Sequence, residues 1–274
     1  MTATRRLTLL GMLALALLAT AVDAAAGLQR LYVLHCGQNT GRDQSRWSPG
    51  VNEGKPIDFS NNCYLIRHAK GLLLWDTGVP DAVAAMPDGM VVANGAITYR
   101  RAKTLASQLA ELGVKPVDIT YLALSHTHGD HVGNVALFPA STVLIQGREY
   151  DWVMTTPNKP AFAATQAITK LSGDHDVFGD GSVTIVSTPG HTPGHQSLLV
   201  RLPTTGAVVL TGDAVHFQDN WVHRRVPSMN ADKDQTLASL DRLAKLLAQN
   251  KARLWIGHDK AQSEGLHYAA AAYE

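Results

Sequence analysis

Four side chains that can bind a metal ion lie within six residues of one another. The stretch ALSHTHGDHVGN, residues 123–134, holds His126, His128, Asp130 and His131 directly after an apolar run. Side chains two residues apart on an extended backbone point the same way, and the glycine between the two pairs lets the chain turn. Neutral imidazole and carboxylate are ligands that suit zinc, at about 2.0–2.2 Å. The spacing therefore indicates metal binding, with one pair of side chains available to each of two ions.

Three later apolar runs also end in side chains that can bind metal. His191 lies in STPGHTPGHQS, Asp213 in VVLTGDA and His258 in RLWIGHD. A carboxylate at the end of an apolar strand is costly to bury unless it is paired or bound to metal. Polar residues on loops that a rigid scaffold positions are typical of binding and catalytic sites. We therefore expect these three side chains to complete the site.

The apolar patterns predict the elements that must position these side chains. We expect strands at 28–37, 62–68, 71–78, 118–125, 141–147, 182–188, 195–202, 206–213 and 252–259. We expect helices at 102–112, 148–154 and 232–249, with a further short helix closing the chain. The remaining stretches 38–60, 79–100 and 155–181 are predicted to lack regular structure, and the first two could border the site.

The order of these elements indicates the architecture. Strands come early and late in the chain and helices lie between them. Strict alternation of strand and helix, as in a doubly wound sheet, does not fit this order, whereas two sheets sandwiched between helices do. We see no linker that splits the chain, so we predict one domain over residues 27–274.

Residues 1–26 have the pattern of a secretory signal peptide. A basic start, MTATRR, precedes the apolar run LTLLGMLALALLA, and VDAAAG supplies small residues for cleavage. The apolar run is short for a membrane span, and an uncleaved anchor is the alternative interpretation. We expect cleavage after Ala24 or Ala26 and export, most simply to a bacterial periplasm.

Two cysteines, Cys36 and Cys63, follow the leader. An oxidising compartment would permit a disulfide between them. Two separate buried thiols are an equal alternative at this point. Neither cysteine is placed with a histidine partner that would indicate a nucleophile.

Composition argues against some classes of function. Of the 274 residues 45% are hydrophobic, which is enough for a substantial core. The formal net charge is +1 and no long basic run occurs, so nucleic acid is not an expected partner. After cleavage of the leader we expect no membrane partner either.

Taken together, these motifs resemble the metallo-β-lactamase superfamily over nearly the whole mature chain. The specific mark is HTHGDH followed by a later histidine, aspartate and histidine in this order. The resemblance implies a four-layer αββα sandwich of the α+β class and two bound zinc ions, with Co, Mn or Fe as other divalent metals that such ligands accept. By the superfamily's pattern, His126, His128 and His191 would hold one ion, Asp130, His131 and His258 the other, and Asp213 would bridge them.

Within the superfamily the chain most resembles the N-acyl homoserine lactonases, which are quorum-quenching enzymes. The similar segments are LYVLHCG, NCYLIRHAKGLLLWDTGVPD, TPGHTPGHQSL, LTGDAVHFQDNW and ASLDRLAKLL. The superfamily's true β-lactamases lack an aspartate at the position of Asp213, which argues against antibiotic hydrolysis. The resemblance implies that a metal-bridging hydroxide opens the lactone ring, with Asp130 passing a proton to the leaving alkoxide.

One departure from the lactonases affects the expected chemistry. They usually carry a tyrosine three residues after the bridging aspartate, and this chain has His216 there. We hypothesise that His216 donates a hydrogen bond to the developing oxyanion, with a surface or structural histidine as the alternative. We expect His195 to orient the loop of His191 without binding metal. Candidate walls of an acyl pocket, which could equally be plain packing residues, are Trp47, Phe59, Met86, Met90 and Tyr99.

Three functions remain open at this point. The first is a secreted dinuclear zinc lactonase acting on a small-molecule lactone. The second is a phosphotriesterase or aryl esterase, because the same metal pair can serve a phosphoryl centre. The third is a metal-binding protein without catalysis, which the bridging position of Asp213 disfavours. Related lactonases often dimerise, so a homodimer is also considered.

Overall fold

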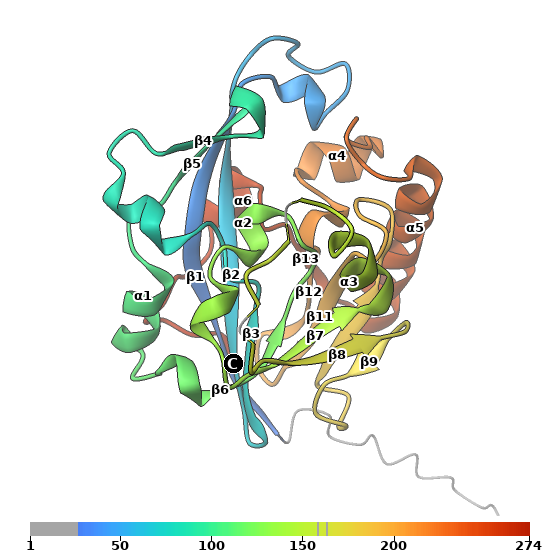
Figure 1. Cartoon of the computed structure of the whole chain (residues 1–274). Helices are drawn as coiled ribbons and strands as arrows, with labels where there is room; N and C mark the ends of the chain where they lie inside the picture. The colour runs from blue at the N-terminus through green and yellow to red at the C-terminus, as the bar shows by residue number, and fades with distance from the viewer. Residues whose placement is uncertain (1–26, 158, 163) are drawn as a thin grey trace, which may run out of the picture.

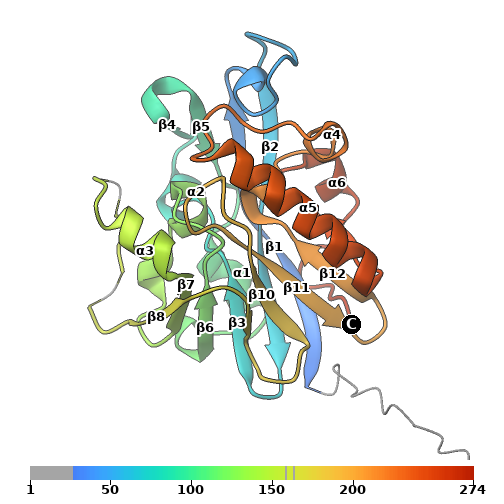
Figure 2. The same cartoon turned by 90° about the vertical axis from the view of Figure 1, so that its right-hand side faces the viewer.

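The computed structural model describes residues 27–157, 159–162 and 164–274. Two β-sheets pack face to face, and helices cover their outer faces, as Figure 1 and Figure 2 show. The predicted αββα architecture is therefore confirmed. The predicted signal peptide, residues 1–26, lies outside the described residues. Within the described ranges, no helix is both long and apolar enough to cross a lipid bilayer.

The first sheet has eight strands in the order β4-β5-β1-β2-β3-β6-β7-β8. They are β1 (Leu28–Gly41), β2 (Ile57–His68), β3 (Gly71–Trp75), β4 (Met90–Val92), β5 (Ile97–Arg100), β6 (Ile119–Ala123), β7 (Thr142–Gln146) and β8 (Ala167–Leu171). Strands β3, β6, β7 and β8 run parallel, and the others pair antiparallel. The parallel strands bring their carboxyl ends to one edge of the sheet, where ligand sites commonly form.

The second sheet has five strands in the order β13-β12-β11-β10-β9. They are β9 (His175–Asp176), β10 (Val183–Ser187), β11 (Gln196–Leu202), β12 (Gly206–Leu210) and β13 (Arg253–Trp255). Strands β12 and β13 are parallel to each other, and the remaining pairs are antiparallel. The segments that follow β10, β12 and β13 carry His191, Asp213 and His258 respectively.

Helices lie outside the two sheets and between their strands. The α-helices are α1 (Leu105–Glu111), α2 (Gly129–Val132), α3 (Gly147–Val153), α4 (Gln218–His223), α5 (Lys233–Asn250) and α6 (Lys260–Glu264). Short 3-10 helices are η1 (Gln44–Arg46), η2 (Asp81–Ala85), η3 (Ala93–Gly95), η4 (Pro116–Asp118), η5 (Val135–Leu137) and η6 (Gly212–Ala214). Asp232 caps the N-terminus of helix α5, because its carboxylate accepts a hydrogen bond from Gln235 N at 2.9 Å.

The main hydrophobic core fills the space between the sheets. Val33 and Leu73 of the first sheet pack in one buried cluster with Ile185, Leu198 and Val208 of the second. A second cluster lies between the first sheet and α1, and a third lies between the second sheet and α5. Each face of each sheet therefore buries apolar side chains, which explains the continuous apolar runs in the central strands.

The stretches predicted to lack regular structure are the main errors of the sequence analysis. Strand β1 continues to Gly41 and β2 already begins at Ile57, so 38–60 is a loop only in its middle. The stretch 79–100 contains η2, β4, η3 and β5, and 155–181 contains β8 and β9. These strands are short or polar, because they lie at sheet edges or face the site, and they lack the apolar alternation that marks a core strand. Helix α4 was also not predicted.

Cys36 and Cys63 form a disulfide between neighbouring strands β1 and β2. Of the two alternatives left open above, the paired cysteines are therefore correct. Both side chains are fully buried in the cluster beneath α1.

The core contact of α5 gives a first prediction. Leu243 is fully buried against the second sheet, so Leu243→Ala should lower the free energy of unfolding by about 2–5 kcal/mol. Urea unfolding followed by circular dichroism would measure the change. The control is Lys245→Ala, which alters an exposed residue of the same helix and should leave the unfolding midpoint unchanged.

Candidate metal centre

The seven side chains predicted as metal ligands meet where the two sheets open at one edge of the sandwich. Their ligand atoms form two groups, each within 4.8 Å. The first group is His126, His128, His191 and Asp213, and the second is Asp130, His131 and His258. Both sheets contribute, because the HTHGDH turn follows β6 and the other ligands follow strands of the second sheet. The structure thus brings together every side chain of the predicted set, while its role as a ligand set stays a prediction.

Asp213 lies between the two groups and is only 4% exposed. Its Oδ2 lies 3.3 Å from His191 Nε2 and 3.6 Å from His126 Nε2. Its Oδ1 lies 3.2 Å from His131 Nε2 and 3.1 Å from His258 Nε2. Each carboxylate oxygen therefore faces one group, which is the arrangement that a bridging ligand requires.

Hydrogen bonds on the outer side of the cluster fix which ring nitrogen faces inward. Nδ1 of His131 lies 2.9 Å from Asp76 Oδ2, and Nδ1 of His258 lies 2.8 Å from the carbonyl oxygen of Ser60. These partners can only accept, so each Nδ1 carries the hydrogen. In the neutral rings Nε2 then presents a lone pair to the centre, as a metal-binding histidine does. His191 is held in the same way by Asn230 Oδ1, at 2.8 Å from its Nδ1.

The inward ring nitrogens lie within hydrogen-bond distance of one another. His131 Nε2 and His258 Nε2 lie 3.3 Å apart, and His191 Nε2 lies 3.0 Å from His128 Nδ1. Asp213 Oδ1 is buried and accepts no hydrogen bond of good geometry in the described part of the chain. Convergent lone pairs of nitrogen and carboxylate oxygen are stable around a cation, and this mixed donor set suits zinc and similar divalent metals. The residues present therefore fit a pair of metal ions.

The charges of the cluster follow from burial and from Asp213. Burial opposes ionisation of Asp213, but His258 and His131 outweigh it and hold the pKa of this carboxyl well below its usual value. Burial lowers the pKa of His126 well below its ordinary value and that of His128 to about 3. For His131 the nearby carboxylates Asp213 and Asp76 outweigh burial and raise the pKa. Asp213 is therefore an ionised group in a buried place, which requires a positive partner.

Asp76 supports the centre and was missed by the sequence analysis. It follows β3, and its Oδ1 accepts a hydrogen bond from Ser125 N at 2.7 Å while its Oδ2 accepts one from His131 Nδ1 at 2.9 Å. Its sequence signal, a carboxylate after the apolar run LLLW, is the same as that of Asp213. The same reasoning could have found it.

Glu149 links two ligand loops and was also missed. Its Oε1 accepts hydrogen bonds from Thr127 N at 2.9 Å and Thr127 Oγ1 at 2.7 Å, and its Oε2 accepts one from Gly194 N at 3.0 Å. Thr127 lies between His126 and His128, and Gly194 lies in the loop of His191. The fully buried Glu149 carboxylate therefore holds the two loops of the first group together. Nothing in the sequence distinguishes this glutamate from a surface residue of α3.

His216 lies inside the cluster, so the alternative of a surface histidine is wrong. Its Nε2 is 3.1 Å from Asp213 Oδ2, and its Nδ1 is buried without a hydrogen-bond partner in the described residues. Burial lowers the pKa of His216 to about 4, and Asp213 opposes this effect only in part. The ring is therefore neutral near pH 7.

The His195 ring hydrogen-bonds Thr188, which lies in the loop of His191, as expected of a residue that orients this loop. Its Nε2 also accepts a hydrogen bond from Asp213 N at 2.9 Å. Its Nδ1 lies 3.1 Å from the carbonyl oxygen of Thr188. His195 therefore anchors Asp213, and it belongs to neither group of candidate ligands.

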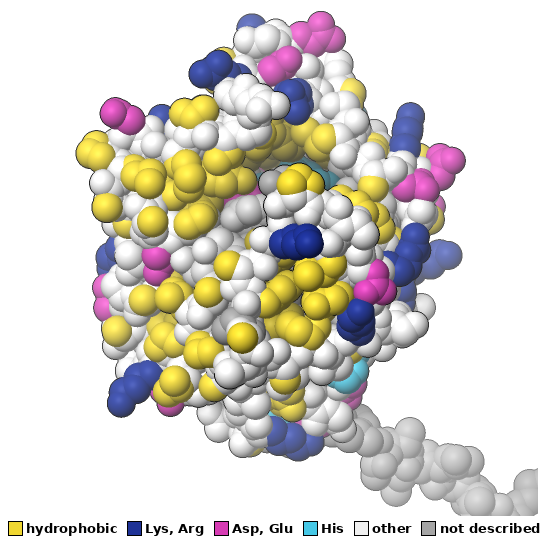
Figure 3. All heavy atoms as spheres, viewed as in Figure 1, with side chains coloured by type: hydrophobic (Ala, Val, Ile, Leu, Met, Phe, Trp, Pro, Cys, Tyr) yellow, Lys and Arg dark blue, Asp and Glu magenta, His cyan; other side chains and the backbone are white. Residues whose placement is uncertain are grey.

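Apolar side chains surround the opening of the site. Figure 3 shows histidine at the bottom of a hollow with hydrophobic side chains along its rim. Trp47 and Phe59 are buried with Phe217, and the Phe59 ring lies 5.8 Å from that of His258. Tyr99 packs beside Met90, and its hydroxyl is 3.4 Å from Asp130 Oδ1. Met86 is exposed. The role of these residues as an acyl pocket stays a prediction.

Comparison with known proteins identifies the family. A model of the metallo-β-lactamase superfamily matches residues 56–249. The chain belongs to this superfamily. The N-acyl homoserine lactonase AttM of Azorhizobium caulinodans is 32% identical over 251 residues, which cover 84% of this chain and 93% of that protein. An N-acyl homoserine lactonase of a Bacillus species is 29% identical over 245 residues, with 87% of this chain and 96% of the relative covered.

Solved structures of this superfamily share the architecture. One is an N-acyl homoserine lactone hydrolase with the product N-hexanoyl-L-homoserine bound at its catalytic metal centre. It superposes with a TM-score of 0.81 at 27% identity and covers 90% of this chain and 100% of its own. The predicted family and fold are thereby confirmed.

The position of Glu149 gives a prediction about metal binding. Glu149→Gln keeps the shape of the side chain but replaces one accepting oxygen with a donor, so a loop of the first group loses its anchor. We expect the affinity for metal to fall by about 10–100-fold, measured by competition with a chromophoric chelator. Glu111→Gln, which alters an exposed glutamate paired with Lys103, should bind metal as the unmodified protein does. Equal affinities for all three proteins would contradict the role of Glu149.

Proposed function

We propose that this protein is a metal-dependent hydrolase that opens the lactone ring of N-acyl homoserine lactones. The observation that carries the proposal is the ionised, buried Asp213 between two groups of ligand atoms. Figure 3 shows histidine in a hollow with an apolar rim. The curated relatives named N-acyl homoserine lactonase support the choice of substrate. An acyl homoserine lactone has a polar ring and an apolar chain, which correspond to the bottom and the rim of this hollow.

Ring opening adds water to an ester. The carbonyl carbon gains a hydroxyl group, the bond to the ring oxygen breaks, and the leaving alkoxide takes a proton. Bound metal ions supply Lewis acidity and lower the pKa of water from about 15.7 toward about 7. We propose zinc as the metal, because five of the seven candidate ligands are histidines, which present ring nitrogen beside the carboxylates of the other two. Co, Mn or Fe are the alternatives.

Asp130 is the residue that we assign to proton transfer. Its side chain is 14% exposed, against 5% for Asp213, so it is the carboxylate that a substrate in the hollow reaches more readily. Asn39 Nδ2 donates to its Oδ2 at 2.9 Å, and the Tyr99 hydroxyl lies 3.4 Å from its Oδ1. These contacts hold the carboxylate in one orientation, from which it can take a proton from the attacking water and pass it to the leaving alkoxide.

A panel of substrates with parallel metal analysis tests the function. We expect release of one acid equivalent per N-hexanoyl homoserine lactone opened, loss of this activity with a chelator, and recovery with zinc. A phosphotriester and an aryl ester, assayed under the same conditions, test the alternative hydrolase. Metal-loaded protein that hydrolyses none of these compounds would instead support a metal-binding protein without catalysis.

The position of His216 gives a prediction about the rate. The Nε2–H faces the cluster beside Asp213, so it can donate to a carbonyl oxygen on which negative charge develops. Loss of one such donor typically lowers kcat by about 10²–10³, which is the expected effect of His216→Ala. His216→Tyr restores the residue that the lactonases usually carry and should keep more of the rate. Unchanged lactone turnover in His216→Ala, at equal metal content, would remove His216 from the mechanism.

We also propose that the mature protein is exported. The leader-like composition of residues 1–26 and the disulfide between Cys36 and Cys63 support this, because disulfides persist in oxidising compartments. Expression of the full chain in a bacterial host should yield a periplasmic protein whose mass places the new N-terminus after Ala24 or Ala26. Recovery of the full-length chain in the membrane fraction would support the uncleaved anchor. The single domain over 27–274 and a homodimer stay predictions, which limited proteolysis and sedimentation would test.

A further inference from the structure

A β-bulge lies in β1 next to the metal centre. In the pairing of β1 with β2, Leu34 lies opposite Cys63 and His35 opposite Asn62, but the next residue in register is Gly37. Cys36 is therefore the extra residue of the bulge. Because side chains alternate between the faces of a strand, one extra residue reverses the alternation of everything that follows.

Because of this reversal, the Asn39 side chain points toward the candidate metal centre. Asn39 lies opposite Phe59, so it shares the face of Asn61 and Cys63, which it would not do in a regular strand. Asn39 is fully buried, and its Nδ2 donates to Asp130 Oδ2 at 2.9 Å. Asn61 Nδ2 donates to the carbonyl oxygen of Asp130 at 2.8 Å. Two neighbouring strands therefore hold Asp130 from one face.

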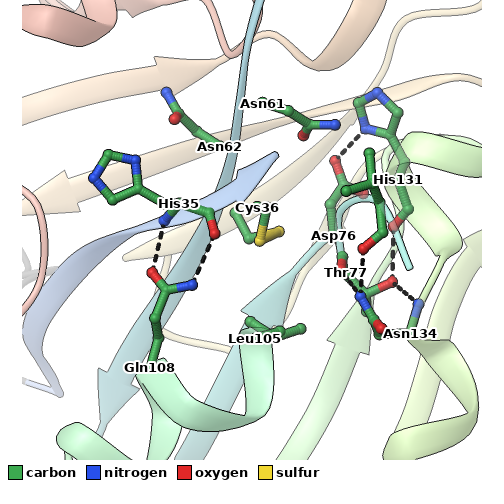
Figure 4. Close-up of a disulfide and its surroundings, with 12 residues drawn as sticks. His35, Cys36, Asn61, Asn62, Asp76, Thr77, Leu105, Gln108, His131 and Asn134 are labelled. Atoms are coloured by element: carbon green, nitrogen blue, oxygen red, sulfur yellow. Dashed lines mark hydrogen bonds and ion pairs between the residues drawn. A yellow bond between two sulfur atoms is a disulfide. The ribbon is translucent and has the colours of Figure 1, made fainter. Parts of the chain in front are cut away.

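The disulfide fastens the extra residue of the bulge to the partner strand. Figure 4 shows Cys36 between the contact of Gln108 with His35 on one side and the network of Asp76 with His131 on the other. The turn after β3 contacts Cys36 directly, because Val79 N donates a hydrogen bond to the Cys36 carbonyl oxygen at 3.0 Å.

The same turn contains Gly78, where a Cβ atom would lie 2.4 Å from Cys36 Cβ. Only glycine permits this close approach, and its φ of +70° also favours glycine. Asp76, which holds His131, lies two residues before Gly78. The position of Asp76 is thus set by packing of the turn against the bulge.

All three ligands of the second group are held by hydrogen bonds to residues of β1, of β2 or of the turn that packs on the Cys36–Cys63 disulfide. Asn39 and Asn61 hold Asp130, and Asp76 holds His131. The Ser60 carbonyl oxygen, three residues before Cys63, holds His258. The first group has other supports, since Glu149 joins its two loops and Asn230 holds His191.

We propose that the Cys36–Cys63 disulfide is a positioning element for the Asp130, His131 and His258 group. The disulfide fixes the register of β1 and β2 at the bulge, so that the Asn39 side chain cannot move to the opposite face of the sheet. It also fixes the position of the turn that carries Asp76. The disulfide thereby sets the affinity for metal at the second position and leaves the first unaffected. The inference rests on the proposed metal assignment and is independent of the substrate.

The experiment compares metal binding with and without the cross-link. In the variant Cys36→Ser/Cys63→Ser, a chelator should remove the two metal ions in two separate steps. The affinity of the second position for metal should be lower by about 10–100-fold, and the affinity of the first position should be unchanged. Elemental analysis at intermediate chelator concentration should find one metal ion per chain, where the unmodified protein keeps two. The matched control is Leu243→Ala, which removes stability from the far side of the second sheet and should still keep both ions.

A second substitution tests whether the disulfide acts through the hydrogen bond from Asn39 to Asp130. This test does not depend on the folding of the serine variant. Asn39→Ala, with the disulfide intact, should lose the same metal ion, and combining it with the serine pair should add less than the sum of the two effects. Two ions retained at full affinity in Asn39→Ala or in the serine variant, or parallel loss of both ions, would overturn the proposal. Two ions bound without hydrolysis of any lactone would overturn the proposed function and leave this inference standing.

Discussion

The structure depends on one buried negative charge. Asp213 is ionised inside a cluster of imidazole rings, and His131 Nε2 and His258 Nε2 lie 3.2 Å and 3.1 Å from its Oδ1. Removal of such a charge from water costs several kcal/mol, even after the protein relaxes. This cost is offset by a positive charge at the centre. Each ligand must also be oriented by a hydrogen bond on the side that faces away from the centre. Hydrogen bonds that Asp76, Ser60, Asn230 and His195 accept hold four of the seven candidate ligands in this way, namely His131, His258, His191 and Asp213.

The two-sheet architecture makes the centre a product of the whole fold. The first sheet supplies the HTHGDH turn after β6, and the second supplies His191, Asp213 and His258 after β10, β12 and β13. Neither sheet alone has a complete set of ligands. The core between the sheets therefore brings the two halves of the centre together, and metal that binds to the closed sandwich stabilises it by mass action.

Much of the fold and of the ligand set could be predicted because it obeys simple patterns. His126, Asp213 and His258 each end an apolar run, and a polar residue at such a place is conspicuous. Asn39 gave no such signal, because it lies in the polar second half of β1 and its direction depends on a bulge that leaves no mark in the residue types. Glu149 is likewise an ordinary helical glutamate until folding brings its carboxylate to Thr127 and Gly194.

The charges around the centre also bear on the choice of substrate. In the described residues, no lysine or arginine side chain hydrogen-bonds or forms an ion pair with any of the seven candidate ligands. Sites that act on anionic phosphoryl groups stabilise the transferred charge with cationic side chains or with bound metal ions. In a neutral ester, negative charge develops at one oxygen only. The polar centre with its apolar rim therefore suits an uncharged, amphiphilic ester.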